Sequence, residues 1–199
     1  DSIMAYKQHF IEWFSGKQLP SYWTKVDIAG AGTYEMVDGV DEGFSITTTS
    51  GTSNRDAITF NQIRPFSPTG SVMIVTAKRV TSANAGANLS MSESNDPITT
   101  AAESWATIHD DTAANAYKAL QTRDSSAHSI VSSSVPRDTA WTNYKLELSG
   151  DAKLHINGSL EITKTTNLPI AKLQPSLRSI SRASNTSEIR VRYLECYNT

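Results

Sequence analysis

The chain has 199 residues, a formal net charge of −2 and a single cysteine, Cys196. One cysteine excludes an intrachain disulfide, and the absence of a basic balance argues against nucleic acid as a partner. No apolar run approaches the roughly 18 residues of a membrane span, so we expect no membrane insertion.

We expect residues 1–199 to form one domain, because all-β domains often use roughly 200 residues as a single unit. The chain begins at Asp1 rather than Met, which predicts a processed or excised chain. Clusters of Ser and Thr, such as "SITTTSGTS", suit exposed strand positions and turns. This composition is typical of extracellular, cell-surface and virion-surface β proteins, and we expect one of these locations.

Turn signals such as Asp38-Gly39, Ser50-Gly51 and Asn157-Gly158 recur along the chain. The runs between them are short and rich in Val, Ile, Thr, Phe and Tyr. No sustained helical periodicity competes with this rhythm, which is that of an antiparallel β-sandwich or barrel. The sequence therefore predicts an all-β fold.

The first half of the chain contains three clear strand candidates. "GFSITTTS" at 43–50 alternates, with Phe44, Ile46 and Thr48 on one face. "AITFNQIRPF" at 57–66 reads as a strand that ends before its proline. "SVMIVTAKRV" at 71–80 is apolar on both faces near its start, as expected for a central strand.

The middle of the chain is harder to interpret. "SANAGANLSMSESNDPITTAAESW" at 82–105 is small, polar and acidic, which predicts a long loop or two short edge strands. "DTAANAYKAL" at 111–120 is rich in alanine, which favours helix. Its length and its neighbours favour strand, and we predict a strand there.

The stretch "WTNYKLELSGDAKLHINGSLEITK" at 141–164 reads as strand, turn, strand, turn, strand. A two-residue Asn157-Gly158 turn would split the apolar side chains of the last hairpin between two faces. A three-residue Asn157-Gly158-Ser159 loop would instead collect them on one face, and each buried side chain is worth roughly 1.5–3 kcal/mol. We therefore predict the three-residue loop, with these side chains inward: Leu154, Ile156, Leu160 and Ile162.

The last strand, "EIRVRYLECYNT" at 188–199, changes phase along its length. Ile189, Val191 and Tyr193 share one face, whereas Leu194 and Cys196 fall on the other. This change predicts either a bulge near Tyr193 or cover on both faces.

Several segments of the chain resemble those of a known superfamily. "WTNYKLEL", "AKLHINGSLEITKTTNLP", "LQPSLRSISRA" and the closing "EIRVRYLECYNT" resemble the C-terminal half of concanavalin A-like lectin/glucanase (laminin-G-like) jelly rolls. "FIEWFSGKQLPSYWT" at 10–24 resembles the N-terminal strand of this superfamily. The resemblance covers about two thirds of the chain and implies two packed, curved antiparallel sheets. It implies no particular activity, because this architecture supports many functions.

The catalytic patterns of enzymes with this fold are missing from the sequence. Retaining glucanases carry Glu-x-Asp-x-x-Glu on one strand, so that two carboxylates lie on the same face, and this chain has no such triplet. Alginate lyases carry Gln-Ile-His, where "NQIRPF" places Arg64 in the position of the histidine. We therefore expect that the chain is not an enzyme, and we name no catalytic residue.

The densest group of chemically capable residues lies in "ESWATIHDDTAANAY" at 103–117. Sugar rings stack on exposed aromatic side chains, so we predict a glycan-binding face formed by Trp105, His109, Tyr117 and Arg123. The alternative for Trp105 is packing in the core, which we expect for the other three tryptophans, Trp13, Trp23 and Trp141.

"IHDDT" also suggests a metal site. Asp110 and Asp111 could offer oxygens to Ca²⁺, which takes six to eight of them, and Ca²⁺ is the one cofactor that we consider. The simpler reading, which we favour, is a polar turn at the end of a strand. No zinc-ligand spacing and no phosphate-binding loop occurs.

The leading functional hypothesis is a non-catalytic, lectin-like surface recognition or adhesion module that binds carbohydrate, with a glycan as its partner. The alternative is a structural subunit of a virion (capsid decoration, tail or fibre) or of an extracellular filament, with neighbouring protein subunits as partners and self-association as a homo-oligomer. A polysaccharide hydrolase or lyase is the third hypothesis. Three N-glycosylation sequons begin at Asn88, Asn157 and Asn185.

Overall fold

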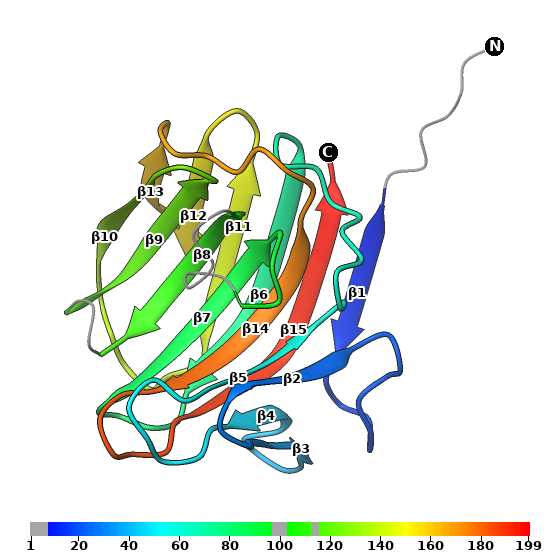
Figure 1. Cartoon of the computed structure of the whole chain (residues 1–199), viewed down its shortest axis with the longest axis vertical. Helices are drawn as coiled ribbons and strands as arrows, with labels where there is room; N and C mark the ends of the chain where they lie inside the picture. The colour runs from blue at the N-terminus through cyan, green and yellow to red at the C-terminus, as the bar shows by residue number, and fades with distance from the viewer. Residues whose placement is uncertain (1–7, 97–102, 113–115) are drawn as a thin grey trace.

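The structure is a computed structural model that describes residues 8–96, 103–112 and 116–199. These residues form two antiparallel β-sheets packed face to face, and both sheets are strongly curved (Figure 1). The described residues contain no helix, and hence none long and apolar enough to cross a membrane. The predicted all-β sandwich is confirmed.

Sheet A has the strand order β13-β12-β11-β6-β15-β4-β3, and β1 pairs with the C-terminal half of β15. The first and last strands of the described chain therefore lie side by side (Figure 1). The strands of sheet A are β1 (His9–Trp13), β3 (Thr33–Val37), β4 (Gly43–Thr47), β6 (Ser71–Arg79), β11 (Thr142–Leu148), β12 (Ala152–Ile156), β13 (Ser159–Lys164) and β15 (Glu188–Asn198).

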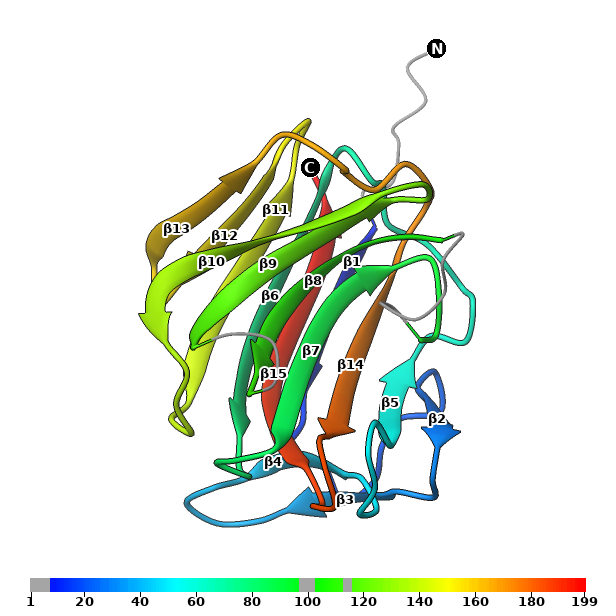
Figure 2. The ribbon, with the colours of Figure 1, turned by 60° about the vertical axis from the view of Figure 1, so that its left-hand side comes forward.

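Sheet B has the order β10-β9-β8-β7-β14-β5-β2 and lies in front of sheet A in Figure 2. Its strands are β2 (Thr24–Ala29), β5 (Arg55–Thr59), β7 (Ala85–Ser92), β8 (Ser104–Asp111), β9 (Tyr117–Asp124), β10 (His128–Pro136) and β14 (Gln174–Ser181). The core between the sheets is built from the inward side chains of both, and at about 25 cal/mol per Å² this buried apolar surface is the main stabilising contribution.

The two sheets also meet at their edges. On one side, the hydroxyl of Ser134 on β10 donates to the Glu161 carboxylate on β13 at 2.7 Å. On the other, Tyr34 of β3 donates to Asp27 of β2 at 2.8 Å, beside the buried carboxyl of Asp56 on β5. Burial, assisted by Asp27, raises the pKa of Asp56 to about 7. Side-chain hydrogen bonds therefore join the sheets at both edges.

A buried ion network lies between the sheets near the start of β11. Arg79 of β6 is 3% exposed and pairs with Asp110 of β8 at 3.3 Å. Lys118 of β9, also buried, donates to Asp138 at 2.9 Å and to Thr142 at 3.0 Å. Each of these buried charges has an opposite charge beside it, as burial requires.

The predicted three-residue hairpin loop is wrong. Ile156 pairs with Ser159, and Asn157 and Gly158 form a two-residue turn with φ values of 50° and 89°. Asn-Gly favours this turn because both residues accept positive φ and the resulting twist matches that of the strands. A bulge then shifts the register between Leu154 and His155. Leu154 pairs with Ile162, whereas the next residue, His155, pairs with Leu160.

The bulge explains which apolar side chains of the hairpin are buried. Leu154, Ile156 and Ile162 are buried as predicted, whereas Leu160 is 53% exposed opposite His155. The conformational preference of Asn-Gly therefore determined the length of the loop, and the side chain of Leu160 was left outside the core.

The prediction of a long loop or two short edge strands at residues 82–105 is also wrong where the structure describes it. Residues 85–92 form β7, a central strand of sheet B between β8 and β14, and residue 104 begins β8. Residues 97–102 lie outside the described residues. The strand predicted at 111–120 is the end of β8 and the start of β9, and residues 113–115 between them are likewise not described.

The tryptophan predictions had mixed outcomes. Trp23 is in the core at 5% exposed, as predicted. Trp13 is 64% exposed on the outer face of sheet A, so its core prediction is wrong. Trp141 is half-buried outside the core cluster, with its ring 4.2 Å from the Arg192 guanidinium and 5.1 Å from the Lys78 ammonium.

The predicted phase change in the last strand is confirmed as a bulge. The pairing of β15 with β6 shifts between Val191 and Tyr193. Ile189 and Val191 before the shift, and Leu194 and Cys196 after it, all belong to the core.

Candidate functional site

The four residues predicted to bind a glycan lie on one face of sheet B. Ala106 and Ile108 of β8 point into the core, so Trp105 and His109 point outward. Arg123 of β9 lies directly opposite Trp105, and Tyr117 falls on the same outward face of β9. We call this surface the outer face of sheet B.

Polar side chains from four neighbouring strands form a layer on this face. Although they point away from the core, most of them are almost completely buried: Asn88, Ser90 and Ser92 of β7, Thr107, His109 and Asp111 of β8, Gln121 of β9, and Gln174, Ser176 and Arg178 of β14. Trp105 is only 1% exposed, whereas Tyr117 is 43% exposed. The layer is thus enclosed at its centre and reaches solvent on β9.

A chain of hydrogen bonds fixes the chemistry of His109. Arg178 donates from Nε and a terminal nitrogen to Asn88 Oδ1, at 3.2 and 2.7 Å. Because arginine can only donate, the other atom of the Asn88 amide is its NH₂ group, which faces His109 Nδ1 at 3.2 Å. Nδ1 therefore accepts, and the ring proton of a neutral His109 resides on Nε2.

Burial keeps His109 neutral, because it lowers the pKa of the imidazole to about 4, a shift opposed by Asp111 and reinforced by Arg178. Its Nε2 finds no partner of normal geometry among the described residues, although the side chain of Gln121 faces the ring. His109 thus presents an unfilled N–H donor to the polar layer.

Further buried polar atoms on this face have no hydrogen-bond partner among the described residues. They include the indole Nε1 of Trp105 and the hydroxyl of Ser176. Leaving a buried polar group unsatisfied typically costs about 1–3 kcal/mol, and such a group calls for an explanation such as a water or ligand. The outer face of sheet B therefore holds several buried polar groups that have no hydrogen-bond partner among the described residues.

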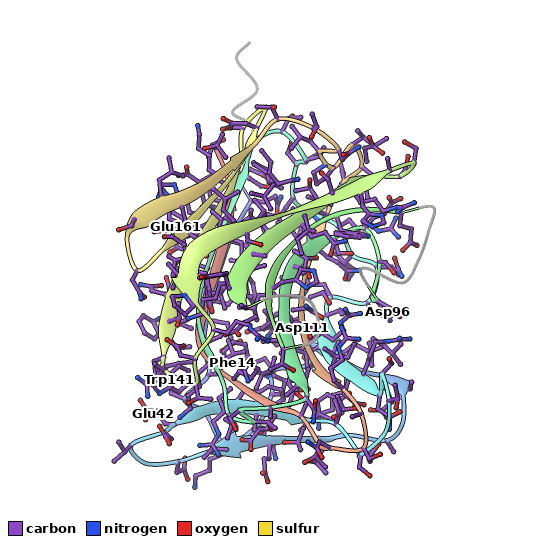
Figure 3. The ribbon with its side chains drawn as sticks, turned by 90° about the vertical axis from the view of Figure 1, so that its left-hand side faces the viewer. Phe14, Glu42, Asp96, Asp111, Trp141 and Glu161 are labelled. Atoms are coloured by element: carbon purple, nitrogen blue, oxygen red, sulfur yellow. The ribbon has the colours of Figure 1, made fainter. Side chains whose placement is uncertain are left out.

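Ion pairs frame the same layer. Asp111 accepts from Nε of Arg182 at 3.2 Å, and Asp96 pairs with both Arg178 and Arg55. Figure 3 shows Asp111 near the middle of the molecule and Asp96 toward one side, opposite Glu161 of β13. These contacts hold the polar layer in place across β5, β7, β8 and β14.

The two aspartates considered for Ca²⁺ do not lie together. Asp110 points inward and pairs with Arg79, whereas Asp111 points outward and pairs with Arg182. Adjacent residues in a strand face opposite sides of the sheet, so the two carboxylates cannot coordinate one ion jointly. No group of three or more His, Cys, Asp or Glu side chains among residues 8–96, 103–112 and 116–199 is arranged to hold a metal.

Sequence reasoning missed Asn88, Ser176 and Arg178, the residues that complete this layer. Asn88 lies in the segment that was interpreted as a long loop or two short edge strands; its side chain is 0% exposed and is held by Arg178 and His109. The one available signal was Arg178, a charged residue in the middle of "PSLRSIS", where small and apolar residues otherwise indicate a buried strand.

Comparison with known protein families and with curated proteins finds no match. Solved structures do match. The Bacillus licheniformis β-glucanase is 12% identical with a TM-score of 0.67, covering 96% of this chain and 98% of that one. An endo-β-galactosidase from Clostridium perfringens that releases GlcNAcα1-4Gal is 14% identical with a TM-score of 0.72, covering 97% and 63%. The Emp47p carbohydrate recognition domain is 8% identical with a TM-score of 0.65, covering 96% and 94%.

These matches correct one expectation from the sequence. The absence of Glu-x-Asp-x-x-Glu led us to expect that the chain is not an enzyme. A β-glucanase, a lichenase and an endo-β-galactosidase share its architecture over nearly its whole length, which contradicts that exclusion.

Carbohydrate recognition domains share the architecture as well. At 8–14% identity these similarities establish the fold alone. The chain has the concanavalin A-like jelly-roll fold.

Proposed function

We propose that the chain binds a carbohydrate on the outer face of sheet B. The observation that carries this proposal is the set of unfilled donors on Trp105, His109 and Ser176, gathered on one enclosed polar face. Sugar hydroxyls accept hydrogen bonds from such groups and also donate to nearby carboxylate and amide oxygens. Tyr117 and Arg123, at opposite ends of β9 on this face, supply a ring and a guanidinium for the adjoining sugar units.

The donors on this face match a neutral or an acidic sugar. Neutral His109 donates from Nε2 at physiological pH, and burial holds its pKa at about 4. Asn88 and Arg178 hold the ring in this tautomer. Because Nε2 already carries the proton, we assign His109 the role of a hydrogen-bond donor to the sugar.

The test is a glycan-binding screen with matched variants. Trp105→Phe keeps the aromatic ring but removes its N–H group, and we expect it to weaken binding of the best glycan about tenfold, the value of one hydrogen bond of roughly 1.4 kcal/mol. Ser184→Ala, at an exposed loop position, is the control and should leave affinity unchanged. A blank screen, or equal affinity for Trp105→Phe and the wild type, would contradict the proposal.

The same preparations should be assayed for new reducing ends, because glycoside hydrolases share this fold. Asp96 and Asp111 pair with arginines of this layer, and exchanging each for its amide would show whether it is needed for any cleavage. The alternative of a virion or filament subunit stays a prediction from the sequence.

A further inference from the structure

The outer face of sheet A carries an exposed aromatic row that the proposed function does not use. In β1 and β15, Trp13 lies opposite Tyr193 and His9 lies opposite Tyr197. Directly opposed residues of an antiparallel pair share a face. The Trp13 and Tyr193 rings are 4.4 Å apart between centroids, and His9 meets Tyr197 edge to face at 5.7 Å. Trp13 is 64% exposed, the largest exposed fraction of any aromatic side chain in the described residues.

A carboxylate lies between the two aromatic pairs. Glu195 accepts from Tyr193 at 2.7 Å and bonds to His9 Nε2 at 2.8 Å. The hydrogen bond from Tyr193, followed by His9, lowers the pKa of Glu195. Glu195 is therefore held as an ionised acceptor in a fixed position, and each of its oxygens retains a further lone pair for a ligand.

The surface is hollowed beside this carboxylate. A depression of about 410 Å³ is lined by His9, Ile74, Glu195 and Tyr197 together with residues 198–199. A second depression of about 290 Å³ shares Ile74 and extends toward His155 on β12. An aromatic wall, an apolar floor and convergent polar groups thus occur together, as in small-ligand sites.

We propose that this outer face of sheet A is a second carbohydrate-binding site, which takes a neutral sugar chain. The apolar faces of pyranose rings stack on Trp13 and Tyr197, while hydroxyl groups donate to Glu195. Positions 193 and 197 are roughly 13 Å apart along the strand at 3.3 Å per residue, a distance that a short oligosaccharide spans. Glu195 and its partner His9 offer no net positive charge for an acidic sugar.

The same polar pair argues against a second copy of the chain as the occupant. A protein interface over this row would remove Glu195 and His9 from water, and the desolvation of such a pair costs several kcal/mol per ion. Sugar hydroxyls instead replace the water that these groups bind. The row is also separate from the outer face of sheet B, since the two faces point to opposite sides of the sandwich (Figure 2).

The test is an NMR titration of the ¹⁵N-labelled protein with hexasaccharides of mixed-linkage β-glucan, cellulose, xylan and galactan. At least one should shift the indole N–H signal of Trp13 and the amide signals of β1 and β15. Trp13→Ala and Glu195→Gln should each weaken that binding at least tenfold. Ile170→Ala, which removes a 66% exposed side chain from the connection between β13 and β14, is the control and should not.

Trp13 is exposed and Glu195 is partly buried at the surface, so an unchanged melting temperature will confirm that both variants fold. The proposal is overturned if no hexasaccharide shifts Trp13, or if Trp13→Ala binds as the wild type does. It is also overturned if light scattering shows a dimer that Trp13→Ala dissociates. The NMR signals of Trp105 report on sheet B separately. An absence of binding at one face therefore does not prevent binding from being measured at the other.

Discussion

The outer faces of the two sheets differ in the polarity and in the solvent exposure of their side chains. On sheet A, the outward residues alternate with core residues and remain partly exposed to solvent, and the largest of them, Trp13, is 64% exposed. On sheet B, the outward residues are polar yet almost fully buried, and Arg178, which is 1% exposed, lies at their centre. One face therefore displays apolar surface to water, while the other withdraws polar groups from it. Both arrangements cost free energy, and we attribute both to ligand binding.

The largest expected effect is a difference in the free energy of unfolding between a variant on sheet B and a variant on sheet A. Arg178→Ala removes a buried cation from Asn88 and Asp96 and leaves buried acceptors unsatisfied, which should lower the free energy of unfolding by about 3 kcal/mol. Trp13→Ala should lower it by less than about 1 kcal/mol, because little buried surface is lost. Urea denaturation measures both values. Comparable losses for the two variants would remove the contrast between the faces.

The second effect is a dependence of stability on pH that comes from sheet B. The pKa of His109 falls from 6.5 to about 4 on folding. Between these values the unfolded chain binds more protons than the folded one, so stability is present above pH 6.5 and is lost as the pH falls toward 4. This single group should cost about 2 kcal/mol at pH 5.

The comparison variant for this effect is His109→Gln, measured beside the wild type by urea denaturation between pH 7 and pH 5. The carboxylates contribute equally to both proteins, so the difference between the two curves isolates His109. If the curves remain parallel over this range, the imidazole is not held neutral inside the layer.

The smallest effect tests the hairpin on sheet A. Leu160→Thr should change the free energy of unfolding by less than about 0.5 kcal/mol, since this side chain is 53% exposed. Ile162→Val, two residues away and buried, should cost about 1 kcal/mol. A larger loss at Leu160 than at Ile162 would restore the three-residue loop that the apolar pattern alone predicts.

The sequence predicts sheet A better than sheet B for a physical reason. In strands with one solvent-exposed face, apolar and polar residues alternate. The strands β11, β12 and β15 can therefore be recognised from the spacing of Val, Leu and Ile. In β7, both faces are enclosed and space is short: a Cβ on Gly86 would lie 2.7 Å from Ile180 and 2.8 Å from Asp111. Small residues are required there, and small polar residues also indicate loops.

The candidate site was predicted in part for the same reason. The register of β8 and β9 brings Trp105, His109 and Arg123 to one face, as the sequence suggested. Asn88 and Arg178 reach it from β7 and β14, two paired strands whose contacting residues are 90 positions apart in the sequence, a separation that local pattern cannot align. The bond from Arg178 through Asn88 to His109 depends on that alignment, and so does the assignment of His109 as a donor.

The most direct test of carbohydrate binding on sheet B is the indole N–H signal of Trp105. In a ¹⁵N NMR titration with the best glycan from the binding screen, a hydrogen bond to the sugar should shift this signal, and the ring N–H of His109 should become protected from exchange. Both changes should saturate at the same glycan concentration. If the glycan binds while Trp105 and His109 stay unperturbed, the enclosed polar layer is not the binding site.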